Sequence, residues 1–260
     1  MRDCIVYLAH LVKIESGIFD AYIDFRLDRD LYYFVSSSPQ NQDFGKTKTY
    51  IELRSLKTTR RLSTGCYYKL NLDLLNRCDF TENEESLVIG RSYDLESIEF
   101  LDYNDQDLLQ SHEALDRNDL MHNHENGRLQ IPDFFKGDLF LLVRDVGLAN
   151  WNELLDENNI IRIVYDIGAK LLANQVIVRK LFNSRLNALK RDKPILVISH
   201  WDIDHYHCLE CASIQEIRAC FSKVVCMDMM KSLTSQRIYE KILYALGSNN
   251  VFCIKPAFRI

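Results

Sequence analysis

One run of the chain joins a short apolar segment directly to a dense cluster of ionisable side chains. The apolar segment is residues 194–198, and the cluster that follows, residues 200–207, holds three histidines and two aspartates. An apolar run that ends abruptly in such side chains is typical of a buried strand that delivers polar groups at its carboxyl end. We therefore predict a sheet whose edge carries a candidate metal site.

Strand and helix patterns alternate on both sides of this run. Apolar stretches at residues 138–147 and 160–168 each end in a glycine, which lets the chain reverse, and we expect both to be buried strands. The remaining predictions are helices at 175–190, 214–221 and 234–246 and strands at 194–198, 223–227 and 250–254. Alternation of strands with helices predicts an α/β architecture.

Residues 1–130 have a different pattern. Aromatic and β-branched residues at period two predict half-buried strands, and a serine-rich stretch at 36–42 predicts a loop between two of them. The predicted strands are residues 5–12, 19–25, 31–35 and 49–53. A polar, acidic stretch near residues 102–130 is typical of a linker. We expect a β-rich or α+β amino-terminal module of unknown function over 1–130, followed by an α/β domain over 131–260.

The formal net charge of -5 argues against a protein that binds nucleic acid along its whole surface. The overall charge does not exclude a local basic patch that binds phosphate. The basic stretch at residues 54–61, with Tyr67 and Tyr68 close behind, has the composition of a phosphate-contacting patch, and a solvated turn between strands is the interpretation we prefer.

Cysteine usage and hydropathy indicate the compartment. Eight cysteines are scattered along a chain that shows no signal peptide, which favours reduced thiols. No apolar run reaches the length that spans a bilayer. We therefore expect a cytoplasmic protein with no membrane partner.

The residues His200, Asp202, Asp204 and His205 form the pattern His-x-Asp-x-Asp-His. Imidazole and carboxylate groups clustered on one loop suit a divalent metal, because each supplies a lone pair. The carboxylates shift the preference towards manganese, iron or magnesium beside zinc. One loop rarely surrounds a metal alone, so other loops on the same edge would supply further ligands. A helix start with acidic capping residues is the alternative interpretation.

Other candidate ligands have simpler interpretations. His207 is either an extra ligand or, as we prefer, a surface ring. Cys208-x-x-Cys211 has redox or zinc spacing, but without a second pair we interpret it as a coincidence at a helix start. His122 and His124 have metal-like spacing within a polar stretch, where we expect both rings to be solvated.

The sequence Ser-His-x-Asp-x-Asp-His, which begins at Ser199, resembles the signature of the metallo-β-lactamase superfamily. It is similar to the variant found in the nuclease-like domain of competence DNA-uptake proteins. Asp145-Val146-Gly147 resembles the family's first-strand turn, and Asp166-Ile167-Gly168 resembles its Asp-x-Gly turn. The resemblance implies an αββα-type sandwich, of which residues 131–260 form only the first half.

By this resemblance, His200 and Asp202 hold one metal ion, and Asp204 and His205 hold the second. The implied cofactors are two divalent ions, zinc or manganese, and a metal-bound hydroxide attacks an ester or phosphodiester. Asp204 also orients the attacking water, and Asp166 supports the metal loop by hydrogen bonding rather than direct ligation. The implied protein is a metal-dependent hydrolase whose substrate is a nucleic acid or another phosphodiester.

The resemblance stops after the first half of the family's domain. Family members carry a further histidine, a bridging aspartate and a final histidine downstream, whereas this chain has no histidine after His207 and its only later aspartate is Asp228. Either the chain is part of a longer protein, or a partner protein supplies the other ligands, or the site is incomplete. The alternative function is a catalytically incomplete scaffold or binding protein whose amino-terminal module recognises a partner.

Overall fold

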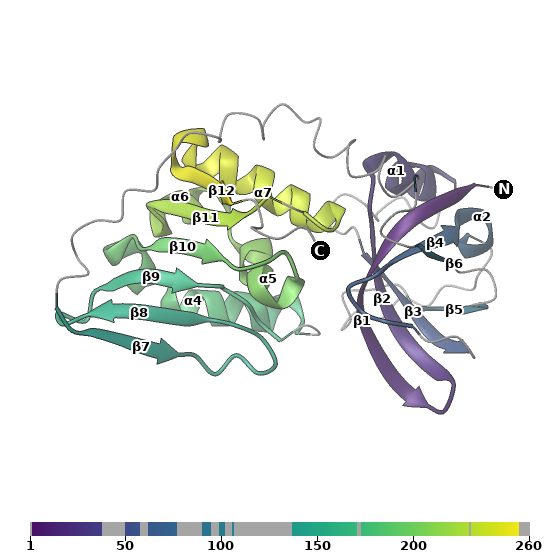
Figure 1. Ribbon diagram of the computed structural model, residues 1–260, viewed down its shortest axis with the longest axis horizontal. Coiled ribbons are helices and arrows are strands. Elements are labelled where there is room, and N and C mark those ends of the chain that lie inside the picture. The colour runs from purple at the N-terminus through teal and green to yellow at the C-terminus, as the bar shows by residue number, and fades with distance from the viewer. Residues whose placement is uncertain are drawn as a thin grey trace. The chain divides into compact units, whose positions relative to one another are not determined.

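The computed structural model describes residues 2–37, 50–57, 62–76, 90–94, 99–101, 106, 137–170, 173–228 and 230–254. The chain divides into two compact units, of which the first comprises Met1–Asn118 with Lys231–Thr234 and the second Asp119–Met230 with Ser235–Ile260. Each unit has a six-stranded sheet (Figure 1). The mixture of helices and sheets is that of an α/β protein. Among the described residues, no helix is long and apolar enough to cross a membrane.

The first unit is a sheet with the strand order β5-β3-β2-β1-β4-β6. All neighbouring strands are antiparallel except β3 and β5, which are parallel. Its elements are β1 (Asp3–Glu15), β2 (Ile18–Phe25), α1 (Asp28–Ser36), β3 (Tyr50–Lys57), β4 (Tyr67–Asn71), α2 (Leu72–Leu75), β5 (Gly90–Asp94) and β6 (Glu99–Leu101). Three of the predicted strands are confirmed, since β1, β2 and β3 cover residues 5–12, 19–25 and 49–53 apart from Thr49, which lies outside the described residues.

The predicted strand at residues 31–35 is wrong, because these residues belong to helix α1. Leu31 and Phe34 are buried whereas Tyr32 is 75% exposed, so the buried positions are three residues apart, as on a helix. Asp28 and Asp30 in the first turn favour a helix start at this point, because carboxylates interact well with the free backbone N–H groups there.

The first half of the basic stretch is part of a strand, not of a turn. Residues 54–57 lie within β3, and the Arg54 guanidinium makes an ion pair with Glu52 at 2.9 Å. Residues 58–61 lie outside the described residues, as do most of the predicted loop at 36–42, the linker near 102–130 except residue 106, and both His122 and His124.

The second unit has the strand order β12-β11-β10-β9-β8-β7. Strands β7, β8 and β9 are antiparallel, and β9 to β12 are parallel (Figure 1). Its elements are β7 (Leu139–Val143), β8 (Asn152–Asp156), β9 (Ile161–Tyr165), α4 (Gln175–Asp192), β10 (Ile195–Ile198), α5 (Ile203–Cys211), α6 (Ile214–Cys220), β11 (Lys223–Met227), α7 (Leu233–Leu246), the 3₁₀ turn η5 (Ser248–Asn250) and β12 (Val251–Ile254). Each strand and helix that the sequence predicts in this half is present.

Three features of this half differ from the predictions. Strand β7 is at the edge of the sheet and is exposed along its length, so the expectation of a buried strand is wrong in this respect. The sequence did not indicate β8, whose polar ends obscure the pattern. The cluster after residue 200 is only partly a loop, because Asp204, His205 and His207 lie on helix α5.

A row of buried side chains crosses the helix-covered face of the second sheet. Val164, Leu196, Val224 and Val251 are paired in register on β9 to β12 and are at most 1% exposed. On β8 the row continues with Glu153, which is fully buried. The row is therefore apolar except at one charged position.

Two arginines compensate for the buried charge of Glu153. Arg144 Nη2 donates to its carboxylate at 2.7 Å, and Arg185 of α4 donates from Nη2 at 2.6 Å and from Nε at 3.0 Å. Such bidentate pairs are among the stronger side-chain hydrogen bonds. Because Arg185 is on α4 and Glu153 on β8, this interaction holds the helix to the sheet.

We predict that Glu153→Gln lowers the free energy of unfolding of the second unit by about 2–3 kcal/mol. The amide is neutral, and only its oxygen can accept hydrogen bonds from the two arginines, since its NH₂ group is a donor. Urea unfolding followed by tryptophan fluorescence measures this unit, since both tryptophans, Trp151 and Trp201, lie in it. The exposed Glu157→Gln variant is the control and should unfold like the wild type. Equal stability of the two variants would show that the Glu153 ion pairs do not stabilise the fold.

Candidate metal centre

The candidate site is at the carboxyl edge of the parallel part of the second sheet. Strands β9 and β10 pair in parallel, with Tyr165 opposite Val197, so the residues that follow them leave the sheet at the same edge. Those residues are Asp166 after β9 and Ser199 after β10. The loop after β10 then leads directly into α5 (Figure 1).

Asp166 connects both strand ends to α5. Its Oδ1 accepts a hydrogen bond from the Ser199 backbone N–H at 2.8 Å, and its Oδ2 accepts from Ser199 Oγ at 2.8 Å and lies 2.7 Å from His205 Nδ1. The side chain is fully buried, and its backbone φ of 58° lies in the left-handed region. The three hydrogen bonds therefore hold a buried carboxylate on a strained turn.

Backbone hydrogen bonds fasten the same turn to α5. Ile167 N donates to His205 O at 2.8 Å, Cys208 N donates to Ile167 O at 3.1 Å, and Asn150 N donates to Asp204 O at 3.1 Å. A Cβ atom on Gly168 would lie 1.7 Å from Asp204 O and 2.8 Å from Asn150 O. Glycine is therefore required at this position of the Asp-x-Gly turn, because three segments of backbone meet there.

We predict that Gly168→Ala separates the Asp166 turn from α5 and lowers the free energy of unfolding by more than about 3 kcal/mol. The added Cβ clashes with backbone atoms, which cannot move aside as a flexible side chain can. Gly247→Ala is the matched control: its φ of 75° makes alanine unfavourable by about 1 kcal/mol, but nothing lies within 4 Å of the added Cβ. Thermal unfolding with tryptophan fluorescence measures both variants. A Gly168→Ala protein as stable as Gly247→Ala would contradict the close approach seen here.

The Ser199 hydroxyl lies between the two histidine rings of the site. Its Oγ is 3.0 Å from His200 Nδ1 and 3.1 Å from His205 Nδ1, and the ring centroids are 3.6 Å apart. An ionised carboxylate can only accept, so the one hydroxyl proton of Ser199 goes to Asp166. His205 Nδ1 then donates to Asp166, and His200 Nδ1 donates to Ser199. We assign both neutral rings to the tautomer with hydrogen on Nδ1, from this network.

In that tautomer both Nε2 atoms carry lone pairs, and each faces a carboxylate. His200 Nε2 lies 3.0 Å from Asp202 Oδ2, and His205 Nε2 lies 3.6 Å from Asp204 Oδ2. Two acceptors facing each other repel unless a proton or a metal ion lies between them. Burial by itself lowers the pKa of His205, but the hydrogen bond to Asp166 and the charges of Asp166, Asp204 and Asp202 outweigh it and raise the pKa. The site therefore attracts positive charge.

The donor pairs fit a divalent ion in chemistry and spacing, but each is only part of a ligand set. Two donors about 2.1 Å from one ion are about 3.0 Å apart at a right angle and about 3.4 Å apart in a tetrahedron, which are close to the two observed separations. Protein sites normally supply at least three ligands. Among the described residues no group of three or more histidine, cysteine, aspartate or glutamate side chains is arranged to hold a metal ion.

The structure brings together all four predicted ligands and places other candidates elsewhere. The expectation of a surface ring at His207 is wrong: the ring is fully buried, and burial lowers its pKa more than the nearby carbonyls of Ala169 and Lys170 raise it. The interpretation as a helix start is confirmed in part, since α5 begins at Ile203 with Asp202 at its N-cap position and Asp204 in its first turn. The Asp202 side chain, however, makes no capping hydrogen bond. Ser199 belongs to the sequence motif, but nothing in the sequence indicates that its hydroxyl contacts both rings.

The two cysteines of Cys208-x-x-Cys211 lie in the second half of α5, not at a helix start. Cys208 Sγ donates to Gly168 O at 3.6 Å, and Cys211 Sγ donates to Gln175 O at 3.7 Å. The two thiols therefore donate hydrogen bonds to different backbone carbonyls. Trp201 is buried, and its Nε1–H donates to Met227 O at 2.7 Å, which holds the loop after β10 against β11.

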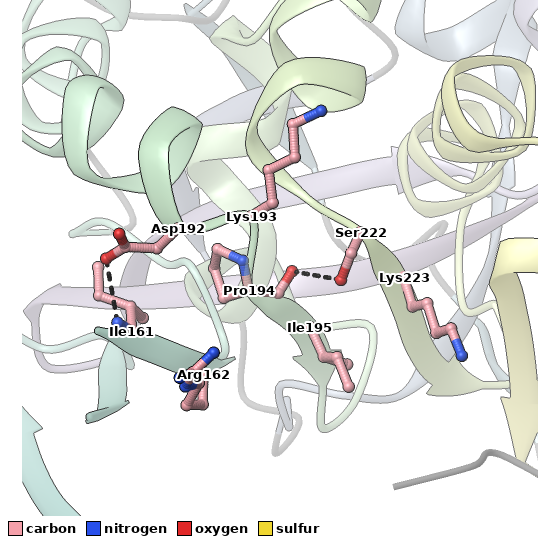
Figure 2. A pocket seen from close by; sticks show the side chains of 8 residues that line it. All are labelled: Ile161, Arg162, Asp192, Lys193, Pro194, Ile195, Ser222 and Lys223. Atoms are coloured by element: carbon pink, nitrogen blue, oxygen red, sulfur yellow. Dashed lines mark hydrogen bonds between the residues drawn. The ribbon is translucent and has the colours of Figure 1, made fainter. Parts of the chain in front are cut away.

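A shallow pocket lies at the opposite edge of this sheet, at the amino ends of the parallel strands (Figure 2). Its lining is Ile161, Arg162, Asp192, Lys193, Pro194, Ile195, Ser222 and Lys223. Asp192 accepts a hydrogen bond from Ile161 N at 3.0 Å, and Arg162 is paired with Asp156 at 2.6 Å. Asp192 and Arg162 are thus used in structural contacts, and the pocket contains none of the candidate ligands.

Comparison of the chain with models of protein families, with curated protein sequences and with solved structures found no match. The resemblance to the metallo-β-lactamase superfamily therefore rests on the motif residues alone.

Proposed function

We propose that the second unit is the first half of a divalent-metal-dependent hydrolase that acts on phosphodiesters or other esters. The observation that carries the proposal is the pair of opposed acceptors at the sheet edge: His200 Nε2 faces Asp202, and His205 Nε2 faces Asp204. Each pair needs a proton or a metal ion between its atoms, and the proposal assigns a metal ion to both. Zinc and manganese both accept this mixture of nitrogen and oxygen donors.

Each residue of the site has a separate role in this proposal. His200 and Asp202 hold one ion, and Asp204 and His205 hold a second. Asp166 and Ser199 fix the rings so that both Nε2 atoms are directed at the ions, as hydrogen-bonding partners of ligand histidines commonly do. In the proposal, Asp204 also orients an attacking water. A bound divalent ion lowers the pKa of water and offsets negative charge that develops on the ester oxygens.

The proposal includes a second layer of the fold, an αββα-type sandwich. What supports it is the face of the sheet opposite to α4, where Leu141, Leu154 and Ile163 are paired in register. This face is apolar and partly open: Leu141 is 67% and Tyr165 46% exposed, whereas Leu154 and Ile163 are half-buried. An apolar sheet face of this kind is normally covered by another layer. That layer, from a longer chain or from a partner protein, would also bring the missing ligands.

We predict that the purified chain binds Mn²⁺ or Zn²⁺ at the two donor pairs, up to about two ions and more weakly than a complete site, because each pair supplies only two protein ligands. Isothermal titration calorimetry and elemental analysis measure the binding. His200→Ala and Asp204→Ala should each lose binding at one ion or both, because half of a donor pair is removed. Ser199→Ala should weaken binding by about tenfold, because it removes the hydrogen-bond partner of the His200 ring without removing a ligand.

The control for metal binding is Glu157→Gln, an exposed carboxylate in the turn between β8 and β9 at the opposite edge of the sheet. It should bind metal like the wild type. Metal binding that is unchanged in the His200→Ala and Asp204→Ala variants would place the ions elsewhere and remove the basis of the proposal.

The reaction is tested with the chromogenic phosphodiester bis(p-nitrophenyl) phosphate and the ester p-nitrophenyl acetate. We expect hydrolysis that requires added Mn²⁺ or Zn²⁺, is abolished by a chelator and is lost in Asp204→Ala, while the circular dichroism spectrum is unchanged. Metal binding without any hydrolysis would favour the alternative function, an incomplete scaffold whose first unit recognises a partner.

A further inference from the structure

Two cysteines that are far apart in sequence lie side by side on the last two strands of the second sheet. Cys226 on β11 and Cys253 on β12 are paired in register, and their Sγ atoms are 3.8 Å apart. Neighbouring strands are about 4.8 Å apart, which is within the range of Cα separations that a disulfide spans. A bond between these thiols therefore needs rotation of side chains but no rearrangement of the sheet.

The surroundings make the two thiols unequal. The Tyr239 hydroxyl of α7 lies 3.3 Å from Cys253 Sγ. The Cys253 thiol donates to this hydroxyl, and once ionised it can accept hydrogen bonds from Tyr239 and Cys226. These hydrogen bonds lower the pKa of Cys253 more than burial raises it, whereas the contact with Cys253, together with burial, raises the pKa of Cys226. Cys253 is also partly exposed, and Cys226 is only 1% exposed. Cys253 therefore ionises first, and the thiolate is the reactive form of cysteine.

The other described cysteines of this unit lack these features. Burial raises the pKa of Cys208 and of Cys211, and both thiols donate to backbone carbonyls. Burial raises the pKa of Cys220 to about 11. These thiols stay protonated at neutral pH, which makes them matched internal controls.

We propose that Cys226 and Cys253 form a redox pair that a hydroperoxide oxidises to a disulfide. The Cys253 thiolate attacks one peroxide oxygen, so that an S–O bond forms, the O–O bond breaks and the other oxygen leaves as hydroxide or alkoxide. The Cys226 sulfur then attacks the sulfenic sulfur of Cys253. An S–S bond forms, the S–O bond breaks, and the departing hydroxide takes up the Cys226 proton as water. Two thiols lose two electrons, and the peroxide gains them.

The pair is connected to the loop that carries the candidate metal ligands. Met227, the residue after Cys226, accepts the Trp201 indole hydrogen bond, and the Tyr239 ring packs edge-on against Trp201 with centroids 6.2 Å apart. Trp201 directly follows His200. A disulfide between β11 and β12 would therefore alter the surroundings of Trp201, and this fluorescent side chain reports the oxidation.

The test uses the full chain, without added metal, treated with hydrogen peroxide and then with an alkylating agent before peptide mass spectrometry. We expect a Cys226–Cys253 disulfide that dithiothreitol reverses, a parallel change in tryptophan fluorescence, and full alkylation of the remaining thiols after denaturation. In Cys226→Ser, peroxide should leave a sulfenic acid on Cys253 that dimedone traps. In Cys253→Ser, neither peroxide nor dimedone should modify position 253. Tyr239→Phe should slow the reaction about fivefold, because one hydrogen bond to the thiolate is lost.

The control is Cys220→Ser, which should oxidise at the wild-type rate. The proposal is overturned if Cys226 and Cys253 are both fully alkylated after a peroxide dose that oxidises free glutathione, or if peroxide joins other cysteines instead. This readout does not depend on metal or on hydrolysis, so it separates failure of the redox pair from failure of the proposed hydrolase.

Discussion

The buried carboxylate of Asp166 is the interaction on which the candidate site depends. A carboxylate leaves water at a large cost unless its oxygens are hydrogen bonded, and this one lies against a backbone N–H, a hydroxyl and an imidazole. These partners come from the loop after β10 and from α5, whereas Asp166 itself follows β9. One side chain therefore brings three segments into register, and Gly168 allows their backbones to meet.

The arrangement of Ser199 follows from that carboxylate. Since Asp166 takes the hydroxyl proton, Ser199 can only accept from His200, and the imidazoles of His200 and His205 are left with lone pairs on the far side of each ring. Each of these lone pairs points at a carboxylate oxygen, and two acceptors repel each other at this distance. Positive charge between them, from a proton or a metal ion, removes the repulsion, so the cluster attracts positive charge. In the proposed metal centre, the ends of parallel strands would supply half of a ligand set, and the partly open apolar face would receive the layer that completes it.

Sulfur chemistry in this chain illustrates how spacing in sequence can mislead. The Cys208-x-x-Cys211 pattern looks like a redox or metal motif, yet helix α5 directs the two thiols to separate carbonyls. Cys226 and Cys253 show no motif, because 27 positions separate them. Parallel pairing of β11 with β12 puts them opposite each other, and a tyrosine from α7 completes their surroundings. Only the register of the sheet creates this pair.

The sequence by itself determined the alternation of strands and helices in the second half, the position of the ionisable cluster and the four ligand candidates, because hydrophobic period and strand-end chemistry are local properties. Predictions from the sequence were wrong where burial or conformation depends on contacts with other parts of the fold. Strand β7 is exposed since only β8 pairs with it, and His207 is buried since α5 turns that side of the cluster into the core. Residues 31–35 have the aromatic and β-branched composition of a strand, but the side chains that become buried, Leu31 and Phe34, are three residues apart, as on a helix. The tautomers of the histidines likewise depend on contacts across 39 positions, from Asp166 to His205, which only the tertiary structure provides.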